Sequence, residues 1–167
     1  LVAGRKLFIT SDGGNRWQET QIYGSTDFRG GIPELLSIRF ADKKRGLAIG
    51  SVLSKDGEVV LDSLVMRTED GGDTWQRVAV PVRAELFHLD YNGSSRAWIV
   101  GDKGTILATT DSGKTWQPQR SGTDRALFNV DFRDDSEGYA VGGRGTILRT
   151  ENGGATWQKV PTSFQGT

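Results

Sequence analysis

The residues of this sequence that could do chemistry are acidic side chains, one histidine and scattered arginines. Cleaving a glycosidic bond needs two carboxyl groups that face each other across the sugar. The acidic candidates for such a pair are Glu34, Asp42, Glu85, Asp90, Asp131, Asp134 and Asp135. Their spacing singles out no two of them. We therefore predict no catalytic residue, and we expect the protein not to be an enzyme.

His88, the only histidine, lies shortly before Asp90 on the polar face of an expected strand. A histidine beside a carboxylate can act as a tuned base, but no nucleophile candidate accompanies this pair. One histidine without any cysteine also gives no cluster of metal ligands. We interpret His88 as a polar strand residue and predict neither a metal nor a cofactor.

Charge and glycine content restrict the function classes further. Lys and Arg together number 21, as do Asp and Glu, so the chain has no net charge. A nucleic-acid partner would need a basic surplus, and none is predicted. The segment Gly142–Gly145 could suggest a phosphate-binding loop, but it joins two expected strands and no helix N-terminus follows it. We interpret it as a hairpin turn.

One turn motif recurs four times and organises the whole chain. Each copy begins with an acidic or amide residue and ends with a tryptophan, with glycine between them. The pairs are Asp12 and Trp17, Asp70 and Trp75, Asp111 and Trp116, and Asn152 and Trp157. An Asp or Asn at the start can accept the N–H two residues on, in an Asx turn, while Trp covers the hairpin with an apolar face. Since one copy carries Asn152, we predict a structural role for the motif.

The segments between these turns alternate as short β-strands do. In Leu127–Phe132 we expect Phe128, Val130 and Phe132 to share one face. The same positions hold Phe87, Leu89 and Tyr91 one repeat earlier, and Leu36, Ile38 and Phe40 before that. Further strands are expected over Gly138–Gly142, over Thr146–Thr150 and from Thr156 onward. Four short strands in about 40–45 residues are typical of a β-propeller blade.

We therefore predict an all-β chain, a β-propeller of four-stranded antiparallel blades. It forms a single propeller domain or part of a larger one. The repeats are approximately 1–25, 26–83, 84–124 and 125–167. Three are expected to be complete, and the first lacks its innermost strand, because Leu1–Gly4 aligns with the second strand of the last repeat. A partner or a second copy could supply that strand, so we expect self-association into a homo-oligomer.

The second repeat is longer than the others. The additional residues lie around Tyr23–Gly31 and around Ser51–Val60. Long loops on a constant scaffold often carry binding surfaces, but they can also be tolerated insertions, and both interpretations stay open. No apolar run approaches the ~20 residues that a membrane-spanning helix needs, and Leu1 in place of Met suggests that an upstream segment was removed.

Polar residues of the first strands form one more pattern. If these strands are innermost, their polar side chains point toward a central channel or the blade ends. The residues are Ser37, Arg39, His88, Asp90, Asn129 and Asp131, with Arg133 just beyond. They either contact a partner or only solvate the channel. The candidate binding residues, including one from the first insertion, are Arg29, Arg39, His88, Asp90 and Arg133.

The longest shared pattern is Gly-x-Ala-Val-Gly-x-x-Gly-Thr-Ile-Leu-x-Thr-x-Asp-Gly-Gly-x-Thr-Trp, and it resembles the repeat of the photosystem II stability/assembly factor family. The turn alone is the Asp-box (bacterial neuraminidase) repeat, which also occurs in sialidases, xyloglucan-degrading glycosidases and sortilin-like receptors. The resemblance extends from Leu1 to Val160. Two positions depart from the pattern: Arg16 replaces the usual Thr, and Asn152 replaces the usual Asp.

The resemblance implies a non-catalytic scaffold that binds membrane-protein subunits during their assembly. It also implies a location in the periplasm, in the thylakoid lumen or outside the cell, and an arginine-rich face that meets the client. Family members are similar to seven-bladed propellers of about twice this length. One alternative is the propeller portion of a secreted glycoside hydrolase, sialidase-like or xyloglucanase-like, or a carbohydrate-binding module. Another is a propeller fragment whose function is self-assembly.

Overall fold

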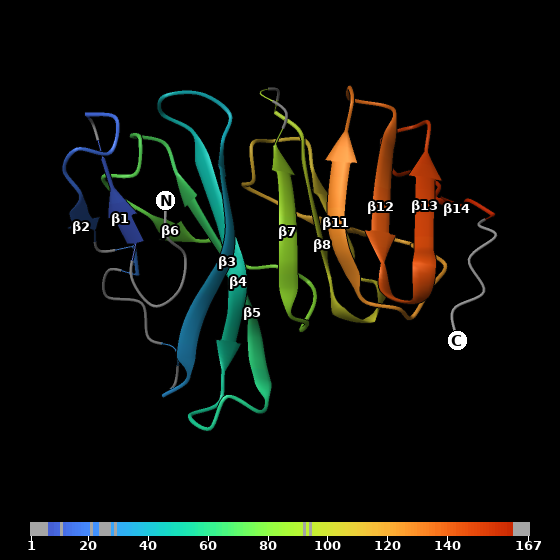
Figure 1. Cartoon of the computed structure of the whole chain (residues 1–167), viewed down its shortest axis with the longest axis horizontal. Helices are drawn as coiled ribbons and strands as arrows, with labels where there is room; N and C mark the ends of the chain where they lie inside the picture. The colour runs from blue at the N-terminus through green and yellow to red at the C-terminus, as the bar shows by residue number, and fades with distance from the viewer. Residues whose placement is uncertain are drawn as a thin grey trace.

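The computed structural model describes residues 7–10, 12–20, 22–23, 28, 30–91, 93 and 95–161. Within these ranges the chain is almost entirely β-structure, in four antiparallel sheets that follow one another in chain order (Figure 1). Each sheet is a meander in which every strand pairs with the next one along the chain. No helix in the described part of the chain is long and apolar enough to cross a membrane.

We name the sheets as blades in chain order. The first blade has β1 (Leu7–Ile9) and β2 (Gln18–Thr20). The second has β3 (Ile32–Phe40), β4 (Gly46–Leu53), β5 (Val60–Thr68) and β6 (Gln76–Arg77). The third has β7 (Leu86–Tyr91), β8 (Ala97–Gly101), β9 (Ile106–Thr109) and β10 (Gln117–Gln119). The fourth has β11 (Leu127–Phe132), β12 (Gly138–Gly142), β13 (Thr146–Thr150) and β14 (Gln158–Lys159).

These sheets are β-propeller blades, and the predicted fold class is confirmed. The second, third and fourth blades each contain four antiparallel strands. Single 3-10 turns, η1 (Asp102–Gly104) and η2 (Gly143–Gly145), join the second and third strands of the last two blades. The described strands of the first blade are β1 and β2, and the strand expected over residues 1–4 lies outside the described residues.

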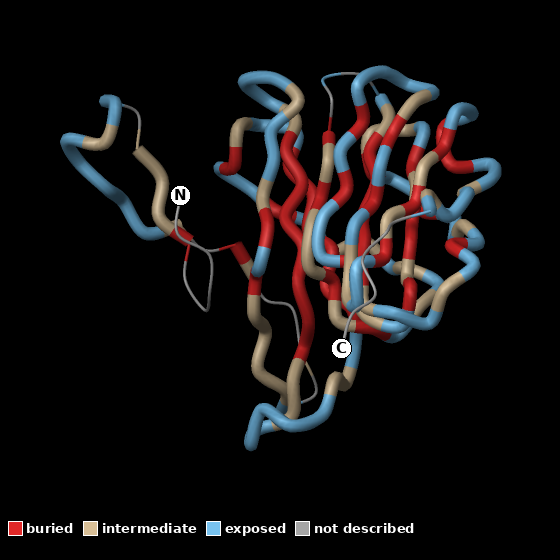
Figure 2. Tube along the Cα trace, turned by 45° about the vertical axis from the view of Figure 1, so that its right-hand side comes forward, coloured by how far each residue is buried: buried red, intermediate tan, exposed pale blue. Residues whose placement is uncertain are grey.

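Apolar side chains between neighbouring blades form the core. Leu47, Ile49 and Val65 of the second blade pack with Leu86 and Leu89 of the third, and all are fully buried. Burying one such side chain stabilises the fold by about 1.5–3 kcal/mol. Figure 2 shows the buried segments along the middle of the strands and the exposed ones at the loops, while the β1–β2 hairpin stands out at one end. The blades are therefore held together face to face.

The expected alternation in the innermost strands is wrong at the first of the three apolar residues of each strand. The pairing of β11 with β12 shifts register between Leu127 and Asn129, which is a β-bulge at Phe128. Leu127 is fully buried and Phe128 is 56% exposed, so Phe128 does not share a face with Val130. The bulge depends on Gly142, since a Cβ there would lie 2.1 Å from the carbonyl oxygen of Ala126. The innermost strands β3 and β7 carry the same bulge, at Leu36 and Phe87.

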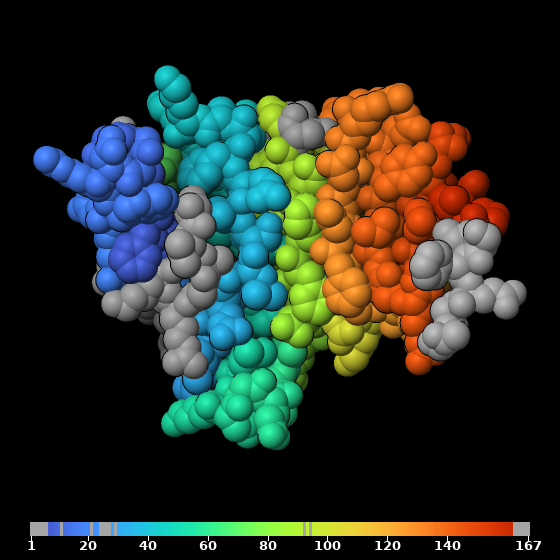
Figure 3. All heavy atoms as spheres, in the orientation of Figure 1, coloured from blue at the N-terminus to red at the C-terminus, as the bar shows by residue number. Residues whose placement is uncertain are grey.

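The insertion around Ser51–Val60 is a paired hairpin that lengthens β4 and β5. Its turn is closed by hydrogen bonds from Ser54 N–H to Val59 O at 2.8 Å and from Gly57 N–H to Ser54 O at 2.8 Å. In the space-filling view the hairpin projects below the other blades (Figure 3). The insertion therefore extends the second blade as regular structure.

Candidate functional site

The Asp-box turns are closed networks of hydrogen bonds. In the second blade, Asp70 accepts the N–H of Thr74 at 2.9 Å and its hydroxyl at 2.5 Å. Thr68 donates its hydroxyl to Asp70 at 2.8 Å and accepts the N–H of Gly72 at 3.0 Å. The carboxylate therefore bonds chiefly to Thr74, four residues on, in addition to the N–H of Gly72, two residues on, that an Asx turn uses. The sequence analysis missed the threonine two positions before the acid, although it recurs in every copy as Thr10, Thr68, Thr109 and Thr150.

These bonds keep the box carboxylates ionised. The hydroxyl and N–H of Thr74 lower the pKa of Asp70 from 3.8 to about 2. Burial alone would raise the pKa of Asp111, but the hydroxyl and N–H of Thr115 outweigh it and the pKa falls to about 2. Asn152 makes the corresponding bond, accepting the N–H of Thr156 at 2.9 Å. A carboxylate that stays charged and bonded in this way is unsuited to act as a general acid.

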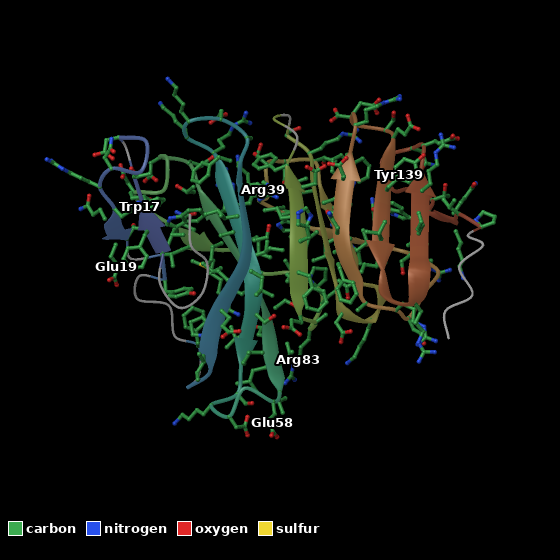
Figure 4. All side chains as sticks on the ribbon, viewed as in Figure 1. Trp17, Glu19, Arg39, Glu58, Arg83 and Tyr139 are labelled. Carbon is green, nitrogen blue, oxygen red and sulfur yellow. The ribbon has the colours of Figure 1, made fainter. Side chains whose placement is uncertain are left out.

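The box tryptophans differ in burial from blade to blade. Trp75 is 9% exposed and Trp116 is 3% exposed, whereas Trp17 of the first blade is 50% exposed. Trp17 lies at one end of the row of blades (Figure 4). Together with Phe8 and with Phe40 and Lys43 of the second blade, it lines an open cleft of about 1060 Å³.

The innermost strands β3, β7 and β11 lie side by side, and polar side chains connect them (Figure 1). Nη2 of Arg39 lies 3.3 Å from Nε2 of His88, and the N–H of Val130 points to Nδ1 of His88 at 3.4 Å. A neutral imidazole has a single acceptor nitrogen, so one of these contacts is a hydrogen bond at a time. Asp90 accepts the N–H of Phe132 at 2.8 Å. Asp90 therefore joins the third blade to the fourth, and His88 joins the third blade either to the second or to the fourth.

The environment shifts the pKa of both ionisable groups on β7, His88 and Asp90. Burial lowers the pKa of His88, and the positive charge of Arg39 lowers it further. Burial also raises the pKa of Asp90, partly opposed by its bond from Phe132. Within the described ranges no hydrogen bond joins His88 to Asp90, so the two do not form the paired base that their spacing could suggest.

The other candidate residues lie elsewhere. Arg133 is largely exposed beyond the end of β11, where it pairs with Glu137 at 2.5 Å and with Asp134 at 3.6 Å. Arg29 lies outside the described residues. The structure thus places Arg39 on β3 beside His88 and Asp90 on β7, and we call these three residues the innermost row. Arg133 lies beyond it.

A cationic cleft, which the sequence analysis did not predict, lies between the third and fourth blades. Its cavity of about 910 Å³ is lined by the loop after β10, by the β12–β13 turn and by β14. The basic residues of this cleft are Arg120, Arg125, Arg144 and Lys159. Asp124 is the acidic residue of the lining, and it lies 3.4 Å from Arg125. The other three cations form no ion pair with any residue that the structure describes.

Metal ligands do not gather in the described part of the chain. No group of three or more His, Asp or Glu side chains there could hold a metal ion. The acids of the Asp boxes are bonded inside their own turns, and Asp90 of the innermost strands accepts a backbone N–H. The surfaces that remain for recognition are the exposed ends of the innermost row, the cationic cleft and the open cleft at Trp17.

Comparison with known proteins agrees with this architecture. The model of the family described as photosynthesis system II assembly factor YCF48 matches residues 32–120, which is just over half of the chain and spans β3 to β10. No curated protein matches the sequence. The resemblance expected from the repeat is therefore confirmed by the family match.

Two solved structures are similar in fold. A structure described as YCF48 bound to D1 peptide is 23% identical with a TM-score of 0.65, over 79% of this chain and 41% of that one. YCF48 from Cyanidioschyzon merolae is 25% identical with a TM-score of 0.59, over 75% of this chain and 39% of that one. The chain thus spans about two-fifths of the length of these proteins. On the family match, this chain belongs to the photosynthesis system II assembly factor YCF48 family.

Proposed function

We propose that this chain is a non-catalytic module that binds a client protein while a membrane-protein complex is assembled. Family membership supports a role in assembly, and one protein of similar fold is described as bound to D1 peptide. The comparisons give no support to the glycoside hydrolase alternative. A periplasmic or lumenal location follows from the same resemblance and is part of the proposal, as is a single propeller unit divided into the four predicted repeats.

The cationic cleft is the observation on this chain that best supports client binding. Arg120, Arg144 and Lys159 converge there although the whole chain has no net charge. Arginine binds carboxylates through paired, charge-assisted hydrogen bonds. The resemblance implies an arginine-rich face toward the client, and this cleft fits an extended acidic segment.

The test is the affinity of the chain for a D1 peptide, measured by titration calorimetry. The double variant Arg120→Glu, Arg144→Glu should weaken binding by about tenfold or more, or ~1.4 kcal/mol. Added salt should weaken the wild-type interaction, because exposed charges are screened. Lys55→Glu, a charge reversal at the exposed tip of the β4–β5 hairpin, is the matched control and should leave the affinity unchanged. Equal affinity of the double variant and the wild type would contradict the cleft as the client site.

The innermost row is the second proposed contact. Arg39 is exposed on β3, and Arg133 is exposed beyond β11, so both can reach a client, while His88 and Asp90 hold the strands beneath. Arg29 remains a prediction beside them. If Arg39→Gln or Arg133→Gln weakened peptide binding and the cleft variant did not, the client site would lie on this row.

A further inference from the structure

The side chains that link the innermost strands differ between two consecutive pairs of blades. Arg39, Asp90 and Asp131 occupy one position of the repeat. Between the third and fourth blades, the carboxylate of Asp90 accepts the N–H of Phe132 at 2.8 Å. Arg39 has donors and no acceptor, so it cannot make the corresponding bond between the second and third blades. Its Nη2 instead lies 3.3 Å from Nε2 of His88.

His88 lies between two groups that can only donate. Nη2 of Arg39 approaches Nε2 from β3, and the N–H of Val130 points to Nδ1 from β11. In the neutral imidazole one ring nitrogen is an acceptor, so one of these two neighbours forms a hydrogen bond. The bond from Arg39 is charge-assisted and is therefore the stronger of the two. The imidazolium has two N–H donors and no acceptor, so protonation abolishes both contacts.

The charged groups around His88 determine which neighbour the protonated ring favours. Arg39 on β3 repels a positive ring, while Asp90 on the same strand and Asp131 on β11 attract it. The carboxylate of Asp90 is bonded to the fourth blade, and Asp131 belongs to that blade. Protonation therefore shifts the favourable interactions of His88 from the second blade to the fourth.

The second and third blades have other contacts that do not depend on the charge of His88. Leu47 and Leu89 belong to a fully buried apolar cluster between these blades. Arg39 is exposed at the surface, and its Nη1 also donates to the carbonyl oxygen of Ile38 at 2.9 Å. Loss of the contact with His88 thus frees one side of the guanidinium without separating the blades.

We propose that His88 is a proton-operated switch at the junction of the second and third blades. Neutral His88 holds the guanidinium of Arg39, whereas protonated His88 turns toward Asp90 and Asp131 and releases it. The released guanidinium presents its N–H groups at the surface, in the form that pairs with carboxylates. If a client contacts the innermost row, as proposed above, protonation strengthens that contact. The switch itself requires no client.

The direction of the pH dependence follows from the surroundings of the ring. His88 is partly exposed, so a proton from the solvent can reach it. Burial and the charge of Arg39 lower the pKa of His88 from the ordinary 6.5. The ring therefore becomes charged only as the pH falls through this lowered value, and Arg39 is held at neutral pH and released in acid.

The test compares the cost of removing the Arg39 guanidinium above and below the midpoint of His88, which proton NMR measures. Arg39→Met keeps the aliphatic stem and removes every donor, and urea unfolding monitored by circular dichroism gives its stability. About one pH unit above the midpoint, the variant should be less stable than the wild type, because the bond to the imidazole is lost. About one unit below, this loss should disappear or reverse, since the substitution then removes a repulsion.

Two further variants serve as controls. His88→Gln keeps an acceptor, because the amide oxygen accepts a bond from Arg39 at either pH and does not titrate. In this background Arg39→Met should cost the same at both pH values. Arg133→Met removes an exposed arginine that pairs with Glu137, and its effect should also be the same at both.

Three results would overturn the proposal. The first is a cost of Arg39→Met that does not change with pH when His88 is present. The second is an equal change with pH in the His88→Gln background, because the effect would then come from another group. The third is an NMR titration in which His88 stays neutral until the chain unfolds. None of them bears on the affinity for a peptide, so failure of the switch is distinct from failure of client binding.

Discussion

At the scale of single residues, the environment shifts the pKa of the same type of side chain in opposite directions. Asp70 lies at the surface with several donors, and its pKa falls to about 2. Asp90 is half-buried beside the backbone N–H of Phe132, and burial raises its pKa. Solvent and donors favour the charged carboxylate, while burial disfavours it. Position in the blade therefore decides what each acid can do.

His88 gives a direct test at this scale, because it is the only histidine and has a resonance of its own. Its pKa should lie below the ordinary 6.5, since burial and Arg39 both disfavour the imidazolium. Arg39→Gln should raise the pKa, and a proton NMR titration measures both values. Because the folded-state pKa is lowered, this group stabilises the fold above pH 6.5, and the contribution is lost as pH falls through the folded pKa.

The control for this titration is Arg133→Gln, which removes an exposed charge beyond the end of β11. It should leave the midpoint of His88 where it is in the wild type. A wild-type midpoint at or above 6.5 would contradict the arrangement of β3, β7 and β11 described above.

At the scale of the element, equivalent strands differ because their neighbours differ. Trp98 of β8 and Tyr139 of β12 occupy one position of the repeat. Trp98 packs on Phe132 with nearly parallel rings, 9° apart, whereas Tyr139 is 43% exposed. The strand sequence sets an aromatic position, and the following blade decides its burial.

Trp98→Ala should therefore lower the free energy of unfolding by about 3–5 kcal/mol, the cost of truncating a buried aromatic residue. Tyr139→Ala at the equivalent position should cost less than about 1 kcal/mol when the chain is monomeric. Urea unfolding monitored by circular dichroism measures both. Similar losses for the two variants would show that the third and fourth blades do not pack as described.

At the scale of the whole molecule, the Asp boxes couple stability to pH through one repeated bond pattern. Asp70 and Asp111 both have a pKa of about 2 in the folded chain, below the ordinary 3.8. A lowered carboxyl pKa stabilises the fold above the unfolded value and loses this contribution as pH falls through the folded value. The carboxylates are near the surface, so each contribution is small.

The free energy of unfolding should thus decrease as the pH falls from about 4 to 2. The double variant Asp70→Asn, Asp111→Asn should show a shallower decrease, since the amide does not titrate and Asn152 already closes its own box. Urea unfolding at several pH values measures the slope. A double variant with the same slope as the wild type would show that these boxes do not carry the acid sensitivity.

Much of the fold could be predicted because its signals are local. The Asp-box turns and the strands between them indicated four-stranded blades, and three such blades are present. Even so, the bulge at Phe128 puts this side chain on the face opposite to the expected one. The sequence did not indicate the bulge, because it depends on the close approach of Ala126 to Gly142, which is a contact between strands. The role of Thr109 was missed for a similar reason, since its bonds to Asp111 and Gly113 appear only when the turn is closed.

The sequence by itself determined the repeat, the blade architecture and the family, because turn chemistry and alternation act over a few residues. Only the tertiary structure decided which equivalent positions are covered. It buried Trp98 and left Tyr139 exposed, and it brought Arg120 and Arg144 from separate turns into one cleft. Burial and charge at a surface depend on what packs beside it, and neighbouring blades are about 40 residues apart in the chain.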